Sequence, residues 1–247
     1  MKNQYVGDIG DYGKYGLLRF LSGKGIKIGI NWYLTENDGT NDGKFTDYLT
    51  KKDDRLYDDK LFDLLIPIVN KGKKKSVIDV EKRQIIPKAV FFNELLNTTD
   101  LNERNAWHER AKEKLINGNT ELVFADPDNR TLADYNKAGH RNGAKYAALE
   151  ELLDYYNEGK DVVYYCHKAR RKEKDWQNKK REFLDMKSDA KIVVLTFHRG
   201  TQRSYIFATH PENYEKYDKI INEFLSGPWG SVSSGNKRIP FTREKIE

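Results

Sequence analysis

The segment Glu121-Leu122-Val123-Phe124-Ala125-Asp126-Pro127-Asp128-Asn129 joins a short apolar run to a polar turn. Branched and aromatic residues over so short a run predict a buried strand. The proline fixes φ and removes a backbone donor, so the turn has a defined path. In an open α/β sheet, ligands bind beyond the carboxyl ends of the strands. The two carboxylates and the amide therefore indicate a functional site, although an Asx-rich turn leaving a core strand would also explain them.

The composition fits a protein with one sizeable core. The chain has 247 residues, five histidines, a single cysteine (Cys166) and a net charge of +6. The scarcity of cysteine and histidine argues against structural zinc and an internal disulfide. Neither a signal peptide nor an apolar stretch of membrane-spanning length is evident, so we expect a cytoplasmic protein with no membrane partner. The positive charge fits a nucleic acid or nucleotide as partner.

Strand and helix patterns alternate along the chain on both sides of this segment. Strands are predicted at 26–34, 76–80, 85–90, 161–167, 191–198 and 204–209, and helices at 11–21, 91–96, 104–116, 144–156, 175–186 and 214–225. This alternation predicts a Rossmann-like α/β fold, with a mainly parallel sheet, helices on both faces and an antiparallel hairpin near the C-terminus. We expect one domain over residues 1–225, followed by a basic, Gly/Ser-rich tail over 226–247 that is either loose or ordered by a ligand.

Several candidate site residues follow the predicted strands. Asp38, Gly39, Asp42 and Gly43 lie in a loop after the strand at 26–34. Glycines there would let the backbone approach a phosphate or a nucleoside, although the loop lacks the G-x-G-x-x-G pattern and also suits an ordinary turn.

The carboxylates of the Asp126 turn have two possible uses. Asp126 and Asp128 could hold Mg²⁺ through oxygen ligands. Alternatively, Asp126 and Asn129 could orient an exocyclic amine through hydrogen bonds. His167, which ends the strand at 161–167, could act as a general base or be structural.

Basic residues cluster after His167 and at the hairpin. Lys168, Arg170, Arg171 and Arg203 could bind phosphate or face solvent.

The N-terminal helix carries a second group of candidates. Asp8, Asp11, Lys14 and Arg19 accompany three glycines, Gly10, Gly13 and Gly16. Glycine is costly in a helix, so this smooth face suits close packing or the close approach of a ligand. We assign Asp8, Asp11 and Arg19 to a substrate site and Lys14 to a cofactor site.

The order of these motifs resembles that of large-subunit ribosomal RNA adenine-N6 methyltransferases of the class I fold. Those proteins begin with a Gly-x-x-Asp-x-x-Lys-type helix, continue with a strand ending in a Gly-rich cofactor loop, and later have a strand ending in Asp-Pro-Pro-Tyr. Here Gly10-Asp11-Tyr12-Gly13-Lys14-Tyr15 precedes the strand of Trp32, and Asp126-Pro127-Asp128-Asn129 falls where Asp-Pro-Pro-Tyr would. The closing hairpin is similar to the antiparallel end of that fold. The whole chain also resembles a group of bacterial and phage proteins, without an assigned activity, that share Gly-Asp-Ile-x-Asp-Tyr-x-Lys-Tyr-Gly-Leu-Leu-Arg and Asp-Pro-Asp-Asn.

The resemblance implies methyl transfer from S-adenosylmethionine to a base amine in nucleic acid. Lys14 and the 38–43 loop would contact the cofactor, and Asp126 and Asn129 would orient the amine of a flipped or single-stranded base. The sequence departs from the family at Asp128 and Asn129, which replace a proline and the tyrosine that stacks on the base. The loop also lacks a clean Gly-x-Gly.

Two alternatives remain open from the sequence. One is a Mg²⁺-dependent nuclease or phosphodiesterase, in phage defence or counter-defence, with Asp126 and Asp128 as metal ligands and His167 as base. The other is a non-catalytic protein that binds a nucleotide or nucleic acid. A third acid near Asp126 would favour the first, and a cofactor crevice filled by the chain's own residues would favour the second.

Overall fold

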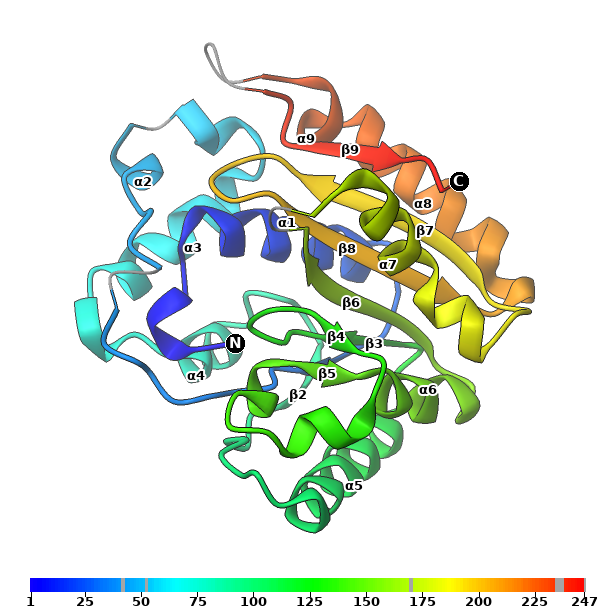
Figure 1. Ribbon diagram of the computed structural model, residues 1–247. Coiled ribbons are helices and arrows are strands. Elements are labelled where there is room, and N and C mark those ends of the chain that lie inside the picture. Colours follow the sequence, from blue (N-terminus) through cyan, green and yellow to red (C-terminus); the bar gives the residue numbers. More distant parts are fainter. Residues whose placement is uncertain (41–42, 52, 169–170, 234–237, 247) are drawn as a thin grey trace.

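The computed structural model describes residues 1–40, 43–51, 53–168, 171–233 and 238–246. A seven-stranded sheet in the order β2-β1-β3-β6-β8-β7-β9 forms its centre (Figure 1). The strands of this sheet are β1 (Ile28–Asn31), β2 (Val90–Phe92), β3 (Leu122–Ala125), β6 (Asp161–His167), β7 (Lys191–Phe197), β8 (Arg203–Thr209) and β9 (Phe241–Glu244). A separate pair, β4 (Thr131–Leu132) and β5 (Ala147–Ala148), lies in the segment that connects β3 to the next helix.

Most strands of the sheet run in one direction. β2, β1, β3 and β6 pair in parallel. β8 lies antiparallel between β6 and β7, so β7 is parallel to β6, and β9 adds an antiparallel edge to β7. The predicted mainly parallel, Rossmann-like sheet with an antiparallel hairpin near its C-terminal end is confirmed.

Helices cover both faces of the sheet, also as predicted. Leu122 and Phe124 of β3 belong to one core, with residues of α1, α3 and α8, whereas Val123 and Ala125 belong to a second core, with residues of α5, α6 and α7. Successive side chains of a strand point to opposite faces, so a strand covered on both sides has a continuous apolar sequence. The helices are α1 (Ile9–Gly23), α2 (Tyr48–Lys51), α3 (Asp59–Val69), α4 (Val77–Lys82), α5 (Leu101–Asn117), α6 (Leu149–Asn157), α7 (Glu173–Met186), α8 (Tyr214–Ser226) and α9 (Pro228–Ser231). None of them, within the described part of the chain, is long and apolar enough to cross a membrane.

Three predicted elements are wrong. Residues 76–80 form the start of α4 rather than a strand, because Ser76 and Asp79 make a capping box at its N-terminus. The strand predicted at 85–90 is displaced, and the helix predicted at 91–96 is absent, because β2 occupies 90–92. β2 pairs in parallel with β1, and this pairing outweighs the local preference of its residues.

The segment 226–247 does not form the tail that its composition predicts. Its described part contains α9 and β9, and β9 pairs with β7 from Phe241↔Phe197 to Glu244↔Val194. Trp229 and Phe241 are buried in the core. Because two large aromatic rings are buried here, this segment completes the domain despite its many small and polar residues.

The glycine face of α1 is a packing surface. A Cβ on Gly13 would lie 2.5 Å from the ring of Phe197, and one on Gly16 would lie 2.3 Å from the ring of Trp229. Gly10 faces the guanidinium of Arg203 in the same way. The absence of side chains therefore brings α1 close to the sheet and to α9.

We predict that Gly13→Ala destabilises the protein, although alanine favours helices by ~1 kcal/mol over glycine. The added methyl group would overlap Phe197, which is fully buried, and overpacking of this kind costs about 1–3 kcal/mol. Urea denaturation would measure the change in the free energy of unfolding. Gly23→Ala, where a Cβ meets no atom within 4 Å, is the matched control. An equal response of both variants would contradict close packing at Gly13.

Candidate functional site

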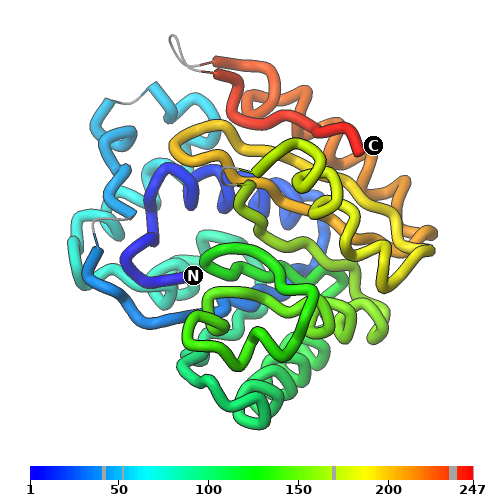
Figure 2. Tube along the Cα trace, in the orientation of Figure 1, coloured from blue at the N-terminus to red at the C-terminus, as the bar shows by residue number. Residues whose placement is uncertain are grey.

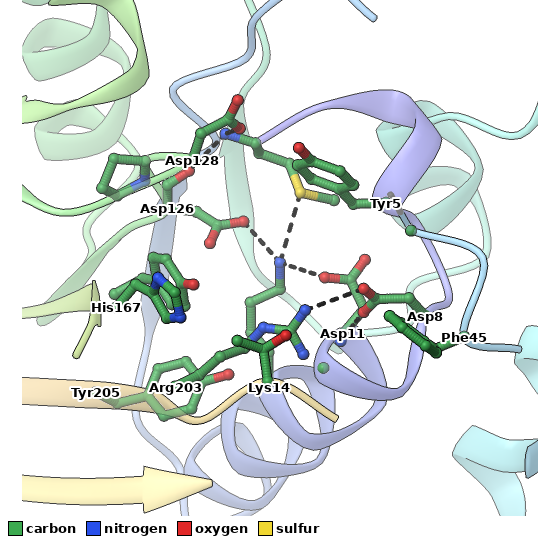
Figure 3. A pocket seen from close by; sticks show the side chains of 16 residues that line it. Tyr5, Asp8, Asp11, Lys14, Phe45, Asp126, Asp128, His167, Arg203 and Tyr205 are labelled. Atoms are coloured by element: carbon green, nitrogen blue, oxygen red, sulfur yellow. Dashed lines mark hydrogen bonds and ion pairs between the residues drawn. The ribbon is translucent and has the colours of Figure 1, made fainter. Parts of the chain in front are cut away.

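A cavity of about 230 Å³ lies at the carboxyl edge of the sheet. It opens between the ends of β3 and β6, the beginning of the antiparallel β8 and the first turns of α1 (Figure 3). The residues that line it are Met1, Tyr5, Asp8, Gly10, Asp11, Lys14, Gly43, Phe45, Asp126, Pro127, Asp128, Tyr165, His167, Thr201, Arg203 and Tyr205.

The floor of the cavity is a buried ion cluster centred on Lys14. Its Nζ lies 2.7 Å from Asp11 Oδ1 and 2.7 Å from Asp126 Oδ2. Tyr15 donates its hydroxyl to Asp11 Oδ2 at 2.8 Å. Burial alone would lower the pKa of Lys14, but the two carboxylates raise it above its usual value, so the ammonium stays charged. Lys14 thus joins α1 to the end of β3.

Arg203 contributes a second cation. Its Nη2 donates to Asp8 Oδ2 at 3.0 Å, and Asp8 also caps α1 by accepting from the backbone N–H of Asp11. The guanidinium lies against Gly10, where any side chain would collide with it. Its Nη1 is buried and has no hydrogen-bond partner among the described residues. An orphaned donor of this kind suits a ligand that offers an acceptor.

The floor has more carboxylates than cations. Asp8, Asp11 and Asp126 share Lys14 and Arg203. Burial raises the pKa of Asp8, opposed by Arg203, and it raises the pKa of Asp126, opposed by Lys14. An excess of buried carboxylates favours a ligand that donates hydrogen bonds or carries positive charge.

His167 stands on the wall of the cavity. Burial, together with the nearby charges of Arg203 and Arg130, lowers the pKa of His167 below its usual value. The imidazole is therefore neutral at pH 7 and able to accept a proton or a hydrogen bond.

The N-terminal residues pair with Asp128. The α-ammonium of Met1 lies 2.7 Å from Asp128 Oδ1, and Lys2 Nζ lies 3.3 Å from Asp128 Oδ2. Burial opposes ionisation, but the Met1 ammonium and Lys2 together lower the pKa of Asp128 below its usual value. Figure 2 shows the N-terminal end beside the segment that follows β3. Asp128 therefore faces these cations, whereas Asp126 faces Lys14.

The first residue of the chain contacts the turn after β1. The Met1 ammonium donates to the carbonyl oxygens of Tyr33 and Asp126, at 3.0 and 2.9 Å, and Thr35 donates its N–H to the Met1 carbonyl at 2.8 Å. The turn after β1 is made by Tyr33, which has φ 43° and a fully buried ring. Met1 therefore lies directly against the end of β1, the place where the resemblance puts the cofactor loop.

The structure brings eight of the predicted site residues together. Those lining the cavity are Asp8, Asp11, Lys14, Gly43, Asp126, Asp128, His167 and Arg203. Asp42 and Arg170 lie outside the described residues.

Some predicted site residues lie apart from the cavity. In the loop after β1, Asp38 accepts hydrogen bonds from Lys2 and Thr40. Gly39 is exposed, and a Cβ there would meet nothing within 4 Å. Asp38 is thus tied to the N-terminal segment through Lys2, and Gly39 faces open space.

Arg19, assigned to the substrate site, has a structural role instead. Its Nε donates to Asp58 at 2.8 Å and its Nη1 donates to the Ile85 carbonyl. Since Asp58 caps α3, Arg19 ties α1 to that helix.

The residues after β3 and β6 hold each other in place. Asn129 donates its N–H to the carbonyl of Lys145 and accepts the N–H of His167, each at 3.0 Å. Arg171 donates to the carbonyls of His167 and Lys168, and Lys168 pairs with Glu173. None of Asn129, Lys168 and Arg171 is among the residues that line the cavity.

The carboxylates do not gather as metal ligands. No group of three or more His, Cys, Asp or Glu side chains in the described ranges could hold a metal ion. Asp126 and Asp128 are neutralised by different cations, as described above.

Sequence reasoning missed the aromatic lining. Tyr165 lies two residues before His167, and Tyr205 lies two residues after Arg203, so each shares a strand face with a residue that was considered. This period of two could have revealed both tyrosines. Tyr5 belongs to a single 3-10 turn (Asn3–Tyr5) and Phe45 to an irregular segment, and both are too short or too irregular for a periodicity to place a side chain.

The fold and the cavity together define a Rossmann-like α/β protein with an acidic, aromatic-lined pocket at the carboxyl edge of its sheet. No family model matches the chain, and no curated protein matches it significantly. One similar solved structure is protein LPL1258 from Legionella pneumophila str. Philadelphia 1, described by the family model DUF519. It is 10% identical, with a TM-score of 0.49, over 99% of this chain and 98% of that one. A similarity of this degree assigns no activity to this chain.

We predict that Lys14→Met destabilises the fold by about 3–5 kcal/mol, because it leaves buried carboxylates without their cation. The loss should depend on pH. Without Lys14, the pKa of Asp126 rises further above its value in the unfolded chain. The folded variant then holds a proton on Asp126 that the unfolded chain has released. The loss of stability is therefore small below the pKa of Asp126 in the unfolded chain, and it grows as pH rises through the pKa of Asp126 in the folded chain.

Urea denaturation at pH 5 and pH 8 should therefore show the larger loss at pH 8. Lys24→Met is the control, because Lys24 makes a partly exposed pair with Glu223 that contributes little. A loss independent of pH would show that Lys14 acts through packing rather than charge.

Proposed function

We propose that this chain recognises nucleic acid and receives one base with an exocyclic amine in the pocket above Asp126 and Lys14. The observation that carries the proposal is the acidic floor beside aromatic walls. An exocyclic amine donates two hydrogen bonds, and carboxylates are acceptors only. Asp8 and Asp126, whose pKa values are raised by burial, gain most from such a donor. A planar base also fits between aromatic side chains.

Cations near the mouth of the pocket support a phosphate-bearing ligand. Arg130 lies close enough to His167 to lower its pKa, and its guanidinium lies 5.8 Å from the ring centroid of Tyr146. Lys75 donates to the carbonyl of Gly43, a lining residue, at 3.2 Å. Within the described ranges neither Arg130 nor Lys75 makes an ion pair with a carboxylate. With a net charge of +6, these residues favour a polyanion whose binding weakens with salt.

Methyl transfer from S-adenosylmethionine is the second candidate, and the strand order favours it. The antiparallel β8 between β6 and β7 is similar to the closing hairpin of the class I methyltransferases. Asp126-Pro127 also follows β3, at the place where those enzymes have Asp-Pro-Pro-Tyr. The contacts of Met1 at the end of β1 do not favour it. For the magnesium-dependent alternative, Asp11 supplies an acid near Asp126, but Lys14 lies between the two carboxylates, and the described residues include no group that could hold a metal ion.

The first test compares oligonucleotides of a single base, in DNA and RNA form, by fluorescence anisotropy at low salt. We expect oligomers of adenine or cytosine to bind about tenfold more tightly than those of thymine or uracil, which lack the amine and would leave buried acceptors unpaired. Asp8→Asn, which removes an acceptor charge, should reduce this preference. Equal affinity for all bases would refute the proposed role of the acidic floor.

The second test measures binding of S-adenosylmethionine by isothermal titration calorimetry. We expect no measurable heat, because Met1 lies against the end of β1, where the cofactor would bind. Micromolar binding, weakened by Lys14→Met, would instead favour the methyltransferase. Tyr165→Phe is the control for general effects on the pocket, since Tyr165 lines it from β6, away from the end of β1.

A further inference from the structure

Phe45 is the most exposed of the large hydrophobic side chains in the described part of the protein. Its exposed fraction is 63%, and it lines the pocket. Figure 3 shows it beside Asp8, across the pocket from His167 and Tyr205. Its ring therefore presents an aromatic face to a ligand that enters the pocket.

The exposure of Phe45 does not come from an unattached loop. Its carbonyl accepts the N–H of Ile9 at 3.0 Å, at the first residue of α1. Gly43, with φ +79°, passes so close to the N-terminal segment that a Cβ would lie 2.5 Å from the Gln4 carbonyl. Lys75 holds the Gly43 carbonyl from the other side. The backbone around Phe45 is therefore fixed against the elements that build the pocket.

This chain has no aromatic side chain at the position where the resembling methyltransferases stack a tyrosine on the base. Asn129 stands where the resembling methyltransferases have the tyrosine of Asp-Pro-Pro-Tyr. Both backbone groups of Asn129 are tied to neighbouring segments, and the residue does not line the pocket. A base entering the pocket would therefore need another aromatic surface.

We infer that Phe45 supplies this surface by stacking on the base, and that the ligand is single-stranded or locally unpaired nucleic acid. The inference rests on the proposed function. With the base against Phe45, its amine would face the carboxylates of Asp8 and Asp126, and Arg203 Nη1 would meet an acceptor on the base edge. Every base has a π face, so stacking itself is tolerant of sequence. In a duplex both faces are covered by neighbours, and a paired base would first have to leave the helix.

The test is anisotropy with a short single-stranded adenine oligonucleotide and with the same strand in a duplex. Phe45→Ala should weaken single-strand binding about tenfold, within the range known for base–aromatic stacking. Phe45→Trp should retain it. The four native tryptophans are all buried, so the added indole at position 45 would be the exposed one. Its fluorescence should be quenched when the base stacks.

The control is Leu95→Ala, which removes another exposed hydrophobic side chain, at 45% exposure, outside this pocket. It should bind like the wild type. The duplex should bind more weakly than the single strand. If the wild type binds the single strand but Phe45→Ala binds equally well, Phe45 does not stack on the base. The proposal that the pocket recognises a base is not affected by that result. If the wild type binds no oligonucleotide at all, the proposed function fails and the inference fails with it.

Discussion

The bridge between Lys14 and the carboxylates of Asp11 and Asp126 is the contact on which the rest of the site depends. It joins α1 to the end of β3, and Lys14 and Asp126 are 112 positions apart in the sequence. Both side chains are buried. Charges removed from water remain in place only when they are paired. The position of α1 is therefore set by this pair as well as by packing. Since α1 also supplies Asp8 and Gly10, the pocket takes its shape from the same contact.

The glycines of α1 make this contact possible. Gly13 and Gly16 let the helix approach Phe197 and Trp229, and Gly10 leaves space for the guanidinium of Arg203. Trp229 comes from the segment after α8, so the C-terminal part of the chain is needed for the packing of the N-terminal helix. One face of α1 therefore packs against the core along most of the helix, and the first turn of the same face lines the pocket.

The pocket and the region beyond β1 have different characters. The pocket is open, acidic at its floor and aromatic on its walls, whereas the region beyond β1 is where Met1 makes hydrogen bonds to Tyr33, Thr35 and Asp126. A methyltransferase needs both regions, and a protein that only recognises a base needs the first. This difference is why base recognition is the leading proposal, although the strand order favours methyl transfer.

The sequence by itself determined the layers of the fold. Continuous apolar runs such as 122–125 reveal strands buried on both faces, and helical periodicity reveals the covering helices, because both signals are local. It also located Asp126, which follows β3, His167, which ends β6, and Arg203, which begins β8. Only the tertiary structure decided what those residues face. The pairing of β2 with β1, the burial of Trp229 and Phe241, and the contacts of Lys14 and Met1 join residues far apart in the chain, and burial then selects which charges meet. Local patterns carry no information about such distant partners, so the ion pairs and the place of Phe45 at the pocket followed only from the folded chain.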